Sequence, residues 1–257
     1  MNLKETLRYL GYKGNKTDEQ TLKLVRECWQ ELELKAEKRA CFREFPLSFE
    51  DAKIDMGCFQ TESQALRKNL RDCSQVVLFA ATLGVQADNL IRRYSHLQMS
   101  RAVVMQAAAA AMLEDYCDQV NEEIRQEYEK KELYLRPRFS PGYGDFPLEC
   151  QPALIRGLEA GKRIGITLTD SLLMMPSKSV TAIIGVSPIE RGRAAERQKE
   201  DRLAEQSDEA SQDSNGQKMD TEKGSCSGEC GWEEQRLDAR GCGACNKTDC
   251  LYRRESI

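Results

Sequence analysis

A loop rich in proline, glycine and aromatic residues has the composition of a ligand-binding segment. Residues 136–147 read Arg-Pro-Arg-Phe-Ser-Pro-Gly-Tyr-Gly-Asp-Phe-Pro. Prolines restrict the backbone, and Gly142 and Gly144 can adopt positive φ, so the segment can hold a rigid irregular path that exposes backbone donors and acceptors. Arg138 could bind a carboxylate through two hydrogen bonds, and Tyr143 offers a ring face and a hydroxyl. The alternative is a purely structural turn between two elements.

A second candidate is residues 169–180, which read Thr-Asp-Ser-Leu-Leu-Met-Met-Pro-Ser-Lys-Ser-Val. Pro176 and the small hydroxyl residues indicate a turn that leads into a strand. Hydroxyl groups beside a lysine could bind an anion. Met174 and Met175 fill hydrophobic cores more often than they contact a cofactor, so a structural role is the alternative here as well.

The C-terminal residues carry a set of closely spaced cysteines, five of the eleven in the chain. They are Cys226, Cys230, Cys242, Cys245 and Cys250. Short spacings with flanking glycines allow the chain to wrap thiolates around one centre, which could be tetrahedral zinc or an iron–sulfur cluster. Thiol–disulfide exchange by Cys242 and Cys245 is a third possibility, and unliganded thiols are the fourth. The spacing does not choose between zinc and iron.

The composition excludes several classes of function. The single histidine, His96, rules out a two-histidine zinc centre and leaves one candidate imidazole base. The net charge of -4 gives no reason to expect nucleic acid as a partner. No run approaches 18 apolar residues, and the N-terminus lacks the apolar core of a signal peptide. The sequence therefore predicts a soluble, cytoplasmic protein without a membrane segment, whose cysteines are reduced.

Three segments of different composition must position these residues. Residues 1–190 alternate apolar runs with polar turns and predict one folded domain. Residues 191–224 contain no aromatic residue and predict a flexible polar linker, because they cannot bury enough apolar surface to fold. A long solvated helix over 194–210 is the alternative. Residues 225–257 form the Cys-rich metal or iron–sulfur tail.

Hydrophobic periodicity predicts the elements of the folded domain. The spacing of Thr17 and Gln20 is that of a capping box at the start of a helix, and further helices are expected from Ser63 to Leu70 and around Leu90. The predicted strands are residues 75–83, 162–168 and 180–187. Strands and helices without strict alternation favour an α+β fold.

The longest predicted helix covers residues 98–131 and carries an unbroken run of five alanines at 107–111. Alanines allow another element to approach closely, so this helix is expected to be central and buried. Glu114 follows the run and would place a carboxylate near the most buried helix. A solvent-facing helical residue is the alternative for Glu114.

These motifs resemble a known family. Arg138-Phe-Ser-Pro-Gly-Tyr143-Gly-Asp is similar to the Arg-x-x-Pro-Gly-Tyr loop of the S-adenosylmethionine-binding reactivation domain of cobalamin-dependent methionine synthase, and residues 169–180 resemble its second signature. The resemblance runs from about residue 82 to 187 and implies a twisted, mainly antiparallel sheet with helices, here in a stand-alone chain. A tyrosine that the family supplies after its last strand has no evident counterpart near residues 188–193.

The resemblance also implies ligands and partners. The family domain binds S-adenosylmethionine and closes over cobalamin that has been oxidised to cob(II)alamin; an electron from a flavodoxin-like donor and the methyl group then restore methylcobalamin. Carried over by motif, Arg138 would bind the ligand carboxylate, and Pro141, Gly142 and Tyr143 would cradle the nucleoside or methionine part. Glu114 would face the ammonium or sulfonium. The cobalamin-binding and catalytic modules are expected on a separate chain.

The sequence thus predicts an accessory protein that reactivates a separate cobalamin-dependent methionine synthase or related corrinoid protein. Methyl transfer from a sulfonium to reduced cobalt requires positioning and exclusion of water but no general base, which suits a chain with one histidine. Two rival hypotheses remain: a redox or metal-sensing interaction protein that acts through its Cys-rich tail, and a non-enzymatic scaffold for a corrinoid protein. Whether the chain itself counts as an enzyme stays open.

Overall fold

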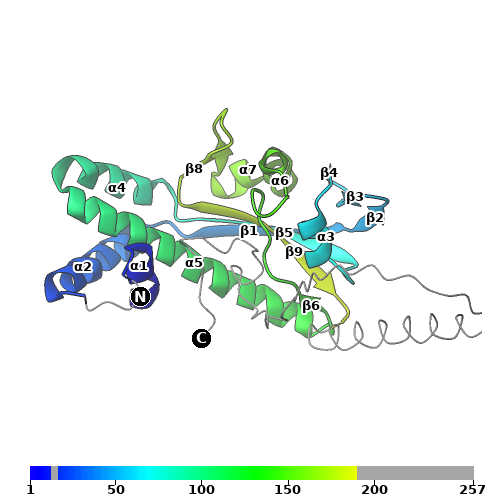
Figure 1. Cartoon of the computed structure of the whole chain (residues 1–257), viewed down its shortest axis with the longest axis horizontal. Helices are drawn as coiled ribbons and strands as arrows, with labels where there is room; N and C mark the ends of the chain where they lie inside the picture. The colour runs from blue at the N-terminus through cyan, green and yellow to red at the C-terminus, as the bar shows by residue number, and fades with distance from the viewer. Residues whose placement is uncertain (13–16, 190–257) are drawn as a thin grey trace, which may run out of the picture.

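A four-stranded antiparallel sheet forms the centre of the fold in the computed structural model, which describes residues 1–12 and 17–189 (Figure 1). The strand order is β1-β5-β9-β6, with β1 at Arg39–Pro46, β5 at Gln75–Thr82, β9 at Ser179–Ser187 and β6 at Tyr134–Leu135. Every strand pair in it is antiparallel. The α+β fold with a mainly antiparallel sheet, predicted from the sequence, is confirmed. The predicted linker and tail lie outside the described residues.

Four helices, of which α5 is the longest, cover one face of this sheet, as Figure 1 shows for α5. They are α1 (Leu3–Tyr9), α2 (Glu19–Lys35), α4 (Val85–Leu97) and α5 (Met99–Glu129). Alternate β5 residues Val77, Phe79 and Ala81 point into this helical face, because successive strand side chains alternate between faces. Ala108 and Ala109 of α5 are fully buried there. The prediction of a central buried helix is confirmed.

Shorter elements cover the opposite face. They are α3 (Gln64–Asn69), the 3₁₀ turn η1 (Leu148–Cys150), α6 (Gln151–Leu158) and α7 (Ala160–Ile164), a small sheet of β2 (Ser48–Glu50), β3 (Lys53–Asp55) and β4 (Gln60–Thr61), and a hairpin of β7 (Thr167–Leu168) and β8 (Met174–Met175). The intervening β5 residues Val76, Leu78 and Ala80 face this second core together with Ile183 of β9. β5 and β9 are therefore buried on both faces.

Two predictions about local structure are wrong. The strand expected at residues 162–168 is wrong: residues 162–164 are the end of helix α7, which Gly165 caps with φ of +75°, and only Thr167–Leu168 pairs as a strand. Ile164 and Ile166 are both buried and are two residues apart, which is the apolar spacing of a strand, although Ile164 is the last residue of helix α7. The predicted capping box fails because Asp18, not Thr17, caps α2: its carboxylate accepts a hydrogen bond from the Thr21 amide at 2.8 Å.

The other predicted elements are present. The helix expected from Ser63 to Leu70 is α3, and Ser63 is its N-cap. β5, α5 and β9 lie within two residues of the predicted bounds, and α4 contains Leu90, around which a helix was predicted. His96 is exposed in the last turn of α4. Of the six cysteines in the described residues, four are buried and Cys58 and Cys150 are half-buried. No helix in this part of the chain is both long and apolar enough to cross a membrane.

Candidate functional site

The free edge of β9 positions the loop that the sequence singled out. Beyond β6 the chain continues alongside β9, where the Arg136 amide donates to the Gly185 carbonyl at 2.7 Å. Phe139 and Ile183 exchange two backbone hydrogen bonds of 2.8 Å. Arg138 lies between these attachments, so its backbone is held at the sheet edge by regular strand-like pairing.

Arg138 reaches from this edge to helix α5. Its Nη2 donates to Asp118 Oδ1 at 2.8 Å and lies 3.4 Å from Glu114 Oε2. The Arg138 side chain is only 16% exposed, against 30% for Glu114 and 52% for Asp118. The two carboxylates are one helical turn apart on the same face of α5. The structure thus brings together the predicted residues Glu114 and Arg138 and adds Asp118, which sequence reasoning missed although its i+4 spacing from Glu114 was visible.

A closed turn follows Arg138. The Gly142 amide donates to the Phe146 carbonyl at 2.9 Å, and the Phe146 amide donates back to the Tyr143 carbonyl at 3.0 Å. Gly142 has φ of +88°, which favours glycine. Pro141 is buried, whereas the Tyr143 side chain is half exposed. This is the irregular path that the prolines and glycines predicted, with an aromatic ring presented outward.

Asp145 fastens the turn to helix α3. Its carboxylate accepts hydrogen bonds from the Ser63 hydroxyl at 2.5 Å and from the Gln64 and Ala65 amides at 2.7 and 3.1 Å. The Ser63 hydroxyl and these two amides hold the pKa of Asp145 below its usual value of 3.8. A Cβ at Gly144 would lie 3.0 Å from the Ala65 Cβ, so the approach is close. Sequence reasoning missed this anchor because its partners are about 80 residues apart.

The hydroxyl groups of the second predicted motif, residues 169–180, form hydrogen bonds with other parts of the fold. The Ser177 amide and hydroxyl both donate to the Asp88 carboxylate of α4, at 2.7 and 2.6 Å. The Ser179 Oγ lies within hydrogen-bond distance of Thr82 Oγ1, at 2.8 Å, and of the Pro176 carbonyl oxygen, at 2.7 Å. These hydroxyls therefore hold the β7–β8 hairpin and the start of β9 against α4 and β5.

Lys178 lies between the two serines of this motif. Burial lowers the pKa of its ammonium group, and the nearby Asp88 carboxylate partly offsets the effect. Its backbone carbonyl accepts a hydrogen bond from the Leu83 amide at 2.9 Å. The anion site expected here would have to be made by the lysine alone, since both neighbouring hydroxyls already bind protein groups.

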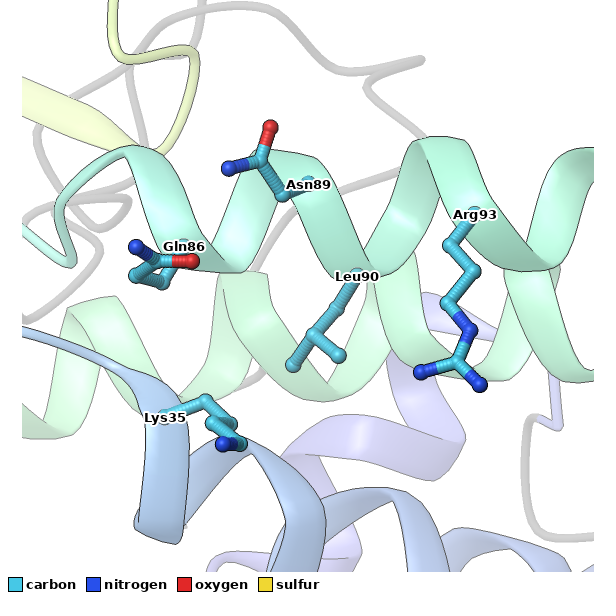
Figure 2. Close-up of a pocket in the computed structure, with 5 residues that line it drawn as sticks. All are labelled: Lys35, Gln86, Asn89, Leu90 and Arg93. Carbon is cyan, nitrogen blue, oxygen red and sulfur yellow. The ribbon is translucent and has the colours of Figure 1, made fainter.

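A shallow hollow between α2 and α4 contains none of the predicted site residues. Its volume is about 220 Å³, and it is lined by Lys35, Gln86, Asn89, Leu90 and Arg93. Figure 2 shows Leu90 pointing from α4 toward α2, with Lys35 across the hollow. The functional residues expected from the sequence lie instead along β9, α5 and the 140–146 turn.

The predicted metal ligands cannot be placed. All five tail cysteines lie outside the described residues. Within residues 1–12 and 17–189, no group of three or more histidine, cysteine, aspartate or glutamate side chains is arranged to hold a metal ion.

Comparison with known proteins identifies the family of this chain. Residues 65–208 match the family model described as the activation domain of vitamin B12 dependent methionine synthase. The chain belongs to this family. The match covers more than half of the chain, includes Arg138, Glu114, Asp118 and the 140–146 turn, and continues into the predicted linker. A search of curated proteins finds no match.

A solved structure of the MetH reactivation domain bound to AdoHcy has a similar fold. The TM-score is 0.52 at 18% sequence identity, over 67% of this chain and 66% of that one. This activation-domain chain therefore spans about two thirds of the solved domain's length and shares its fold.

Proposed function

We propose that this activation-domain protein binds S-adenosylmethionine beside Arg138 and supports the reductive remethylation of cobalamin on a separate cobalamin-dependent methionine synthase. The observation that carries the proposal is the guanidinium of Arg138, held between Glu114 and Asp118 next to the 140–146 turn. Family membership supports the reaction. The ligand in the solved domain, AdoHcy, supports the class of molecule bound.

The charges at the site complement those of S-adenosylmethionine. Arg138 contacts Glu114 and Asp118 through Nη2. Because a guanidinium has five N–H donors, the Arg138 side chain can also bind the ligand carboxylate. The carboxylates of Glu114 and Asp118 would attract the ammonium and sulfonium groups. The exposed ring of Tyr143 would pack against the nucleoside, and Pro141 and Gly142 fix the turn that presents it.

The chemistry requires positioning. One electron from a flavodoxin-like donor reduces cob(II)alamin on the partner to cob(I)alamin, whose cobalt electron pair then attacks the sulfonium methyl carbon. The carbon–sulfur bond breaks as the cobalt–carbon bond forms, and S-adenosylhomocysteine leaves as a neutral thioether. No proton is transferred. The residues of this chain would hold the methyl group in line with the cobalt and exclude water.

Equilibrium binding tests the ligand site. We expect Arg138→Ala to weaken S-adenosylmethionine binding by about 10- to 100-fold, the usual effect of losing a charge-assisted hydrogen-bonded contact. Arg125→Ala is the matched control, because Arg125 lies on α5 and forms an exposed ion pair with Glu122 at 2.9 Å, away from Arg138. Titration calorimetry with both variants gives the comparison. If the unaltered protein has no affinity, or Arg138→Ala binds equally well, this site is wrong.

A reconstitution assay tests the reaction. The full chain is mixed with S-adenosylmethionine, a reduced flavodoxin-like donor and a methionine synthase in the cob(II)alamin state that lacks its own activation domain. We expect the absorbance of cob(II)alamin to convert to that of methylcobalamin only when the full chain is present. Binding to the corrinoid protein that depends on neither S-adenosylmethionine nor cobalt oxidation state would favour the scaffold hypothesis instead.

The five spaced cysteines favour a second candidate function, a metal or iron–sulfur site that senses or relays electrons. Anaerobic purification with metal analysis tests it. A broad visible absorbance that is lost in the Cys242→Ser, Cys245→Ser variant would indicate a cluster. A colourless protein with one zinc per chain would indicate a structural site, and a metal-free protein would contradict both.

A further inference from the structure

The hollow between α2 and α4 has the opposite charge to the Arg138 site. Its lining contains two cations and no acidic residue: Lys35 in the last turn of α2 and Arg93 on α4. Gln86, Leu90 and Arg93 lie on one face of α4, because they are four and three residues apart. Figure 2 shows Leu90 and Arg93 extending from α4 toward α2, with Lys35 on the opposite side. Two positive charges from different helices therefore border one hollow.

The surrounding acidic groups do not neutralise these charges. Among residues 1–12 and 17–189, neither Lys35 nor Arg93 forms an ion pair. The three glutamates within four residues of Lys35 pair with other cations: Glu31 with Arg101 at 3.3 Å, Glu33 with Lys38 at 2.8 Å and Glu37 with Arg39 at 2.7 Å. Asp88, the only acidic residue of α4, accepts two hydrogen bonds from Ser177. The hollow therefore favours an anion.

The size and the other lining groups limit the kind of anion. Leu90 is 8% exposed and gives the hollow an apolar wall. The side-chain amide of Gln86 adds two N–H donors beside the cations. The volume of about 220 Å³ is below the roughly 300–1,000 Å³ of sites for drug-sized ligands. The hollow therefore suits one charged group with at most a short organic part.

We propose that this hollow binds the phosphoryl group of a small phosphorylated ligand, through the Lys35 ammonium, the Arg93 guanidinium and the Gln86 amide. A phosphate monoester carries a charge of about −1.5 to −2 at pH 7 and three acceptor oxygens, so it matches two cations better than a singly charged carboxylate does. Leu90 would contact the carbon that follows the ester oxygen. The site is independent of the one proposed for S-adenosylmethionine, with which it shares no residue.

The bound anion would connect the end of α2 to α4. These helices belong to the face of the sheet that also contains α5. A ligand that binds only the folded chain raises its melting temperature. Phosphate should therefore stabilise the protein more than chloride does at the same ionic strength.

Calorimetric titration of the full chain tests the proposal. The probes are inorganic phosphate and glycerol 3-phosphate, with acetate as a singly charged comparison, all at one ionic strength. The test variant is Lys35→Gln with Arg93→Gln. The matched control is Lys23→Gln with Arg26→Gln, which removes the same two charges at exposed positions of α2. Lys23 and Arg26 lie about 18 and 14 Å from Lys35 along the helix axis.

We expect both phosphate probes to bind saturably and acetate to bind more weakly. The hollow variant should bind phosphate at least about 10-fold more weakly, and the control should bind as the unaltered chain does. Tighter binding of glycerol 3-phosphate would identify an ester as the ligand, and equal affinities would identify free phosphate; either result supports the site. Absence of saturable binding, equal binding of acetate, or an equal loss in the control overturns the proposal.

Two further measurements separate this hollow from the Arg138 site. Arg138→Ala should bind phosphate normally, and loss of phosphate binding in that variant overturns the proposal. In the unaltered chain, added phosphate should shift the backbone amide NMR signals of Lys35 and residues 86–93. This measurement needs no variant, so it decides the matter even if the hollow variant proves unstable. Shifts confined to residues 136–146 would place the anion at the loop and overturn the proposal.

Discussion

The two faces of the central sheet differ in the length of the elements that cover them. The helical face is dominated by α5, a helix of 31 residues. The second face is assembled from α3, α6 and α7, which have six, eight and five residues. Short helices are not stable alone and depend on tertiary contacts. The candidate site therefore has two parts: carboxylates on the long helix α5, and a loop whose conformation depends on contacts with the short helix α3.

Arg138 and Asp145 connect the loop to the two faces. Arg138 joins the loop to Glu114 and Asp118 on the helical face, and Asp145 joins it to α3 on the second face. Core substitutions on the helical side, away from Glu114 and Asp118, should therefore change stability alone, whereas core substitutions beside the turn on the second side should change stability and ligand binding together. The following variants test that distinction, from the largest expected effect to the smallest.

The largest effect is expected from deleting one large buried ring on each face. Phe79→Ala on the helical side and Phe146→Ala on the second side should each lower the free energy of unfolding by about 3–5 kcal/mol, because both rings are almost fully buried. Only Phe146→Ala should also weaken S-adenosylmethionine binding, since Phe146 closes the turn with Gly142 and Tyr143. Urea denaturation and calorimetry measure the two quantities. Equal loss of affinity in both variants would abolish the distinction.

A smaller effect is expected from two glycines with the same backbone conformation. Gly142 and Gly11 have φ of +88° and +86°, so alanine at either position should cost about 1 kcal/mol of stability. Gly11 follows α1 and has nothing within 4 Å of the position of an added Cβ. Gly142→Ala should also weaken S-adenosylmethionine binding several-fold, and Gly11→Ala should not. A Gly142→Ala protein with unchanged affinity would show that the turn does not contact the ligand.

The smallest effect is expected from Asp145→Asn, and it should depend on pH. Because the pKa of Asp145 in the folded protein lies below its usual 3.8, its ionised form adds stability above that value and loses it as the pH falls through the folded-state pKa. The stability of the unaltered protein should therefore exceed that of Asp145→Asn near pH 7, and the difference should shrink below about pH 4. Denaturation curves from pH 3 to 7 measure it. A difference that stays constant over this range would mean that the carboxylate charge does not matter.

The long central elements were predictable from the sequence, whereas two of the other elements, β1 and α7, were not. α5 and the two central strands carry long apolar patterns, which local sequence expresses directly. β1 was not predicted, because Arg39, Arg43 and Glu44 interrupt its apolar pattern, and it is recognisable only by its pairing with β5. α7 was mistaken for a strand because five residues are too few to display a helical period.

The candidate site was partly predictable for a different reason. Arg138, Pro141, Gly142 and Tyr143 belong to one contiguous motif, so the sequence names them together. Asp118 and the Asp145–Ser63 contact involve residues 20 and 82 positions away from their partners, and no local pattern marks such pairs.

By itself, the sequence determined the α+β class, the central alanine-rich helix, the turn-forming loop and, through its motifs, the family. These properties depend on residues that are close together in the chain. The tertiary structure decided which carboxylates surround Arg138, how Asp145 fixes the turn, and that the start of β9 is held against α4. Those features exist only because the antiparallel pairing of β5 and β9 brings distant segments to one sheet edge. That pairing is stabilised by cross-strand contacts between residues far apart in the chain, which no local sequence pattern contains.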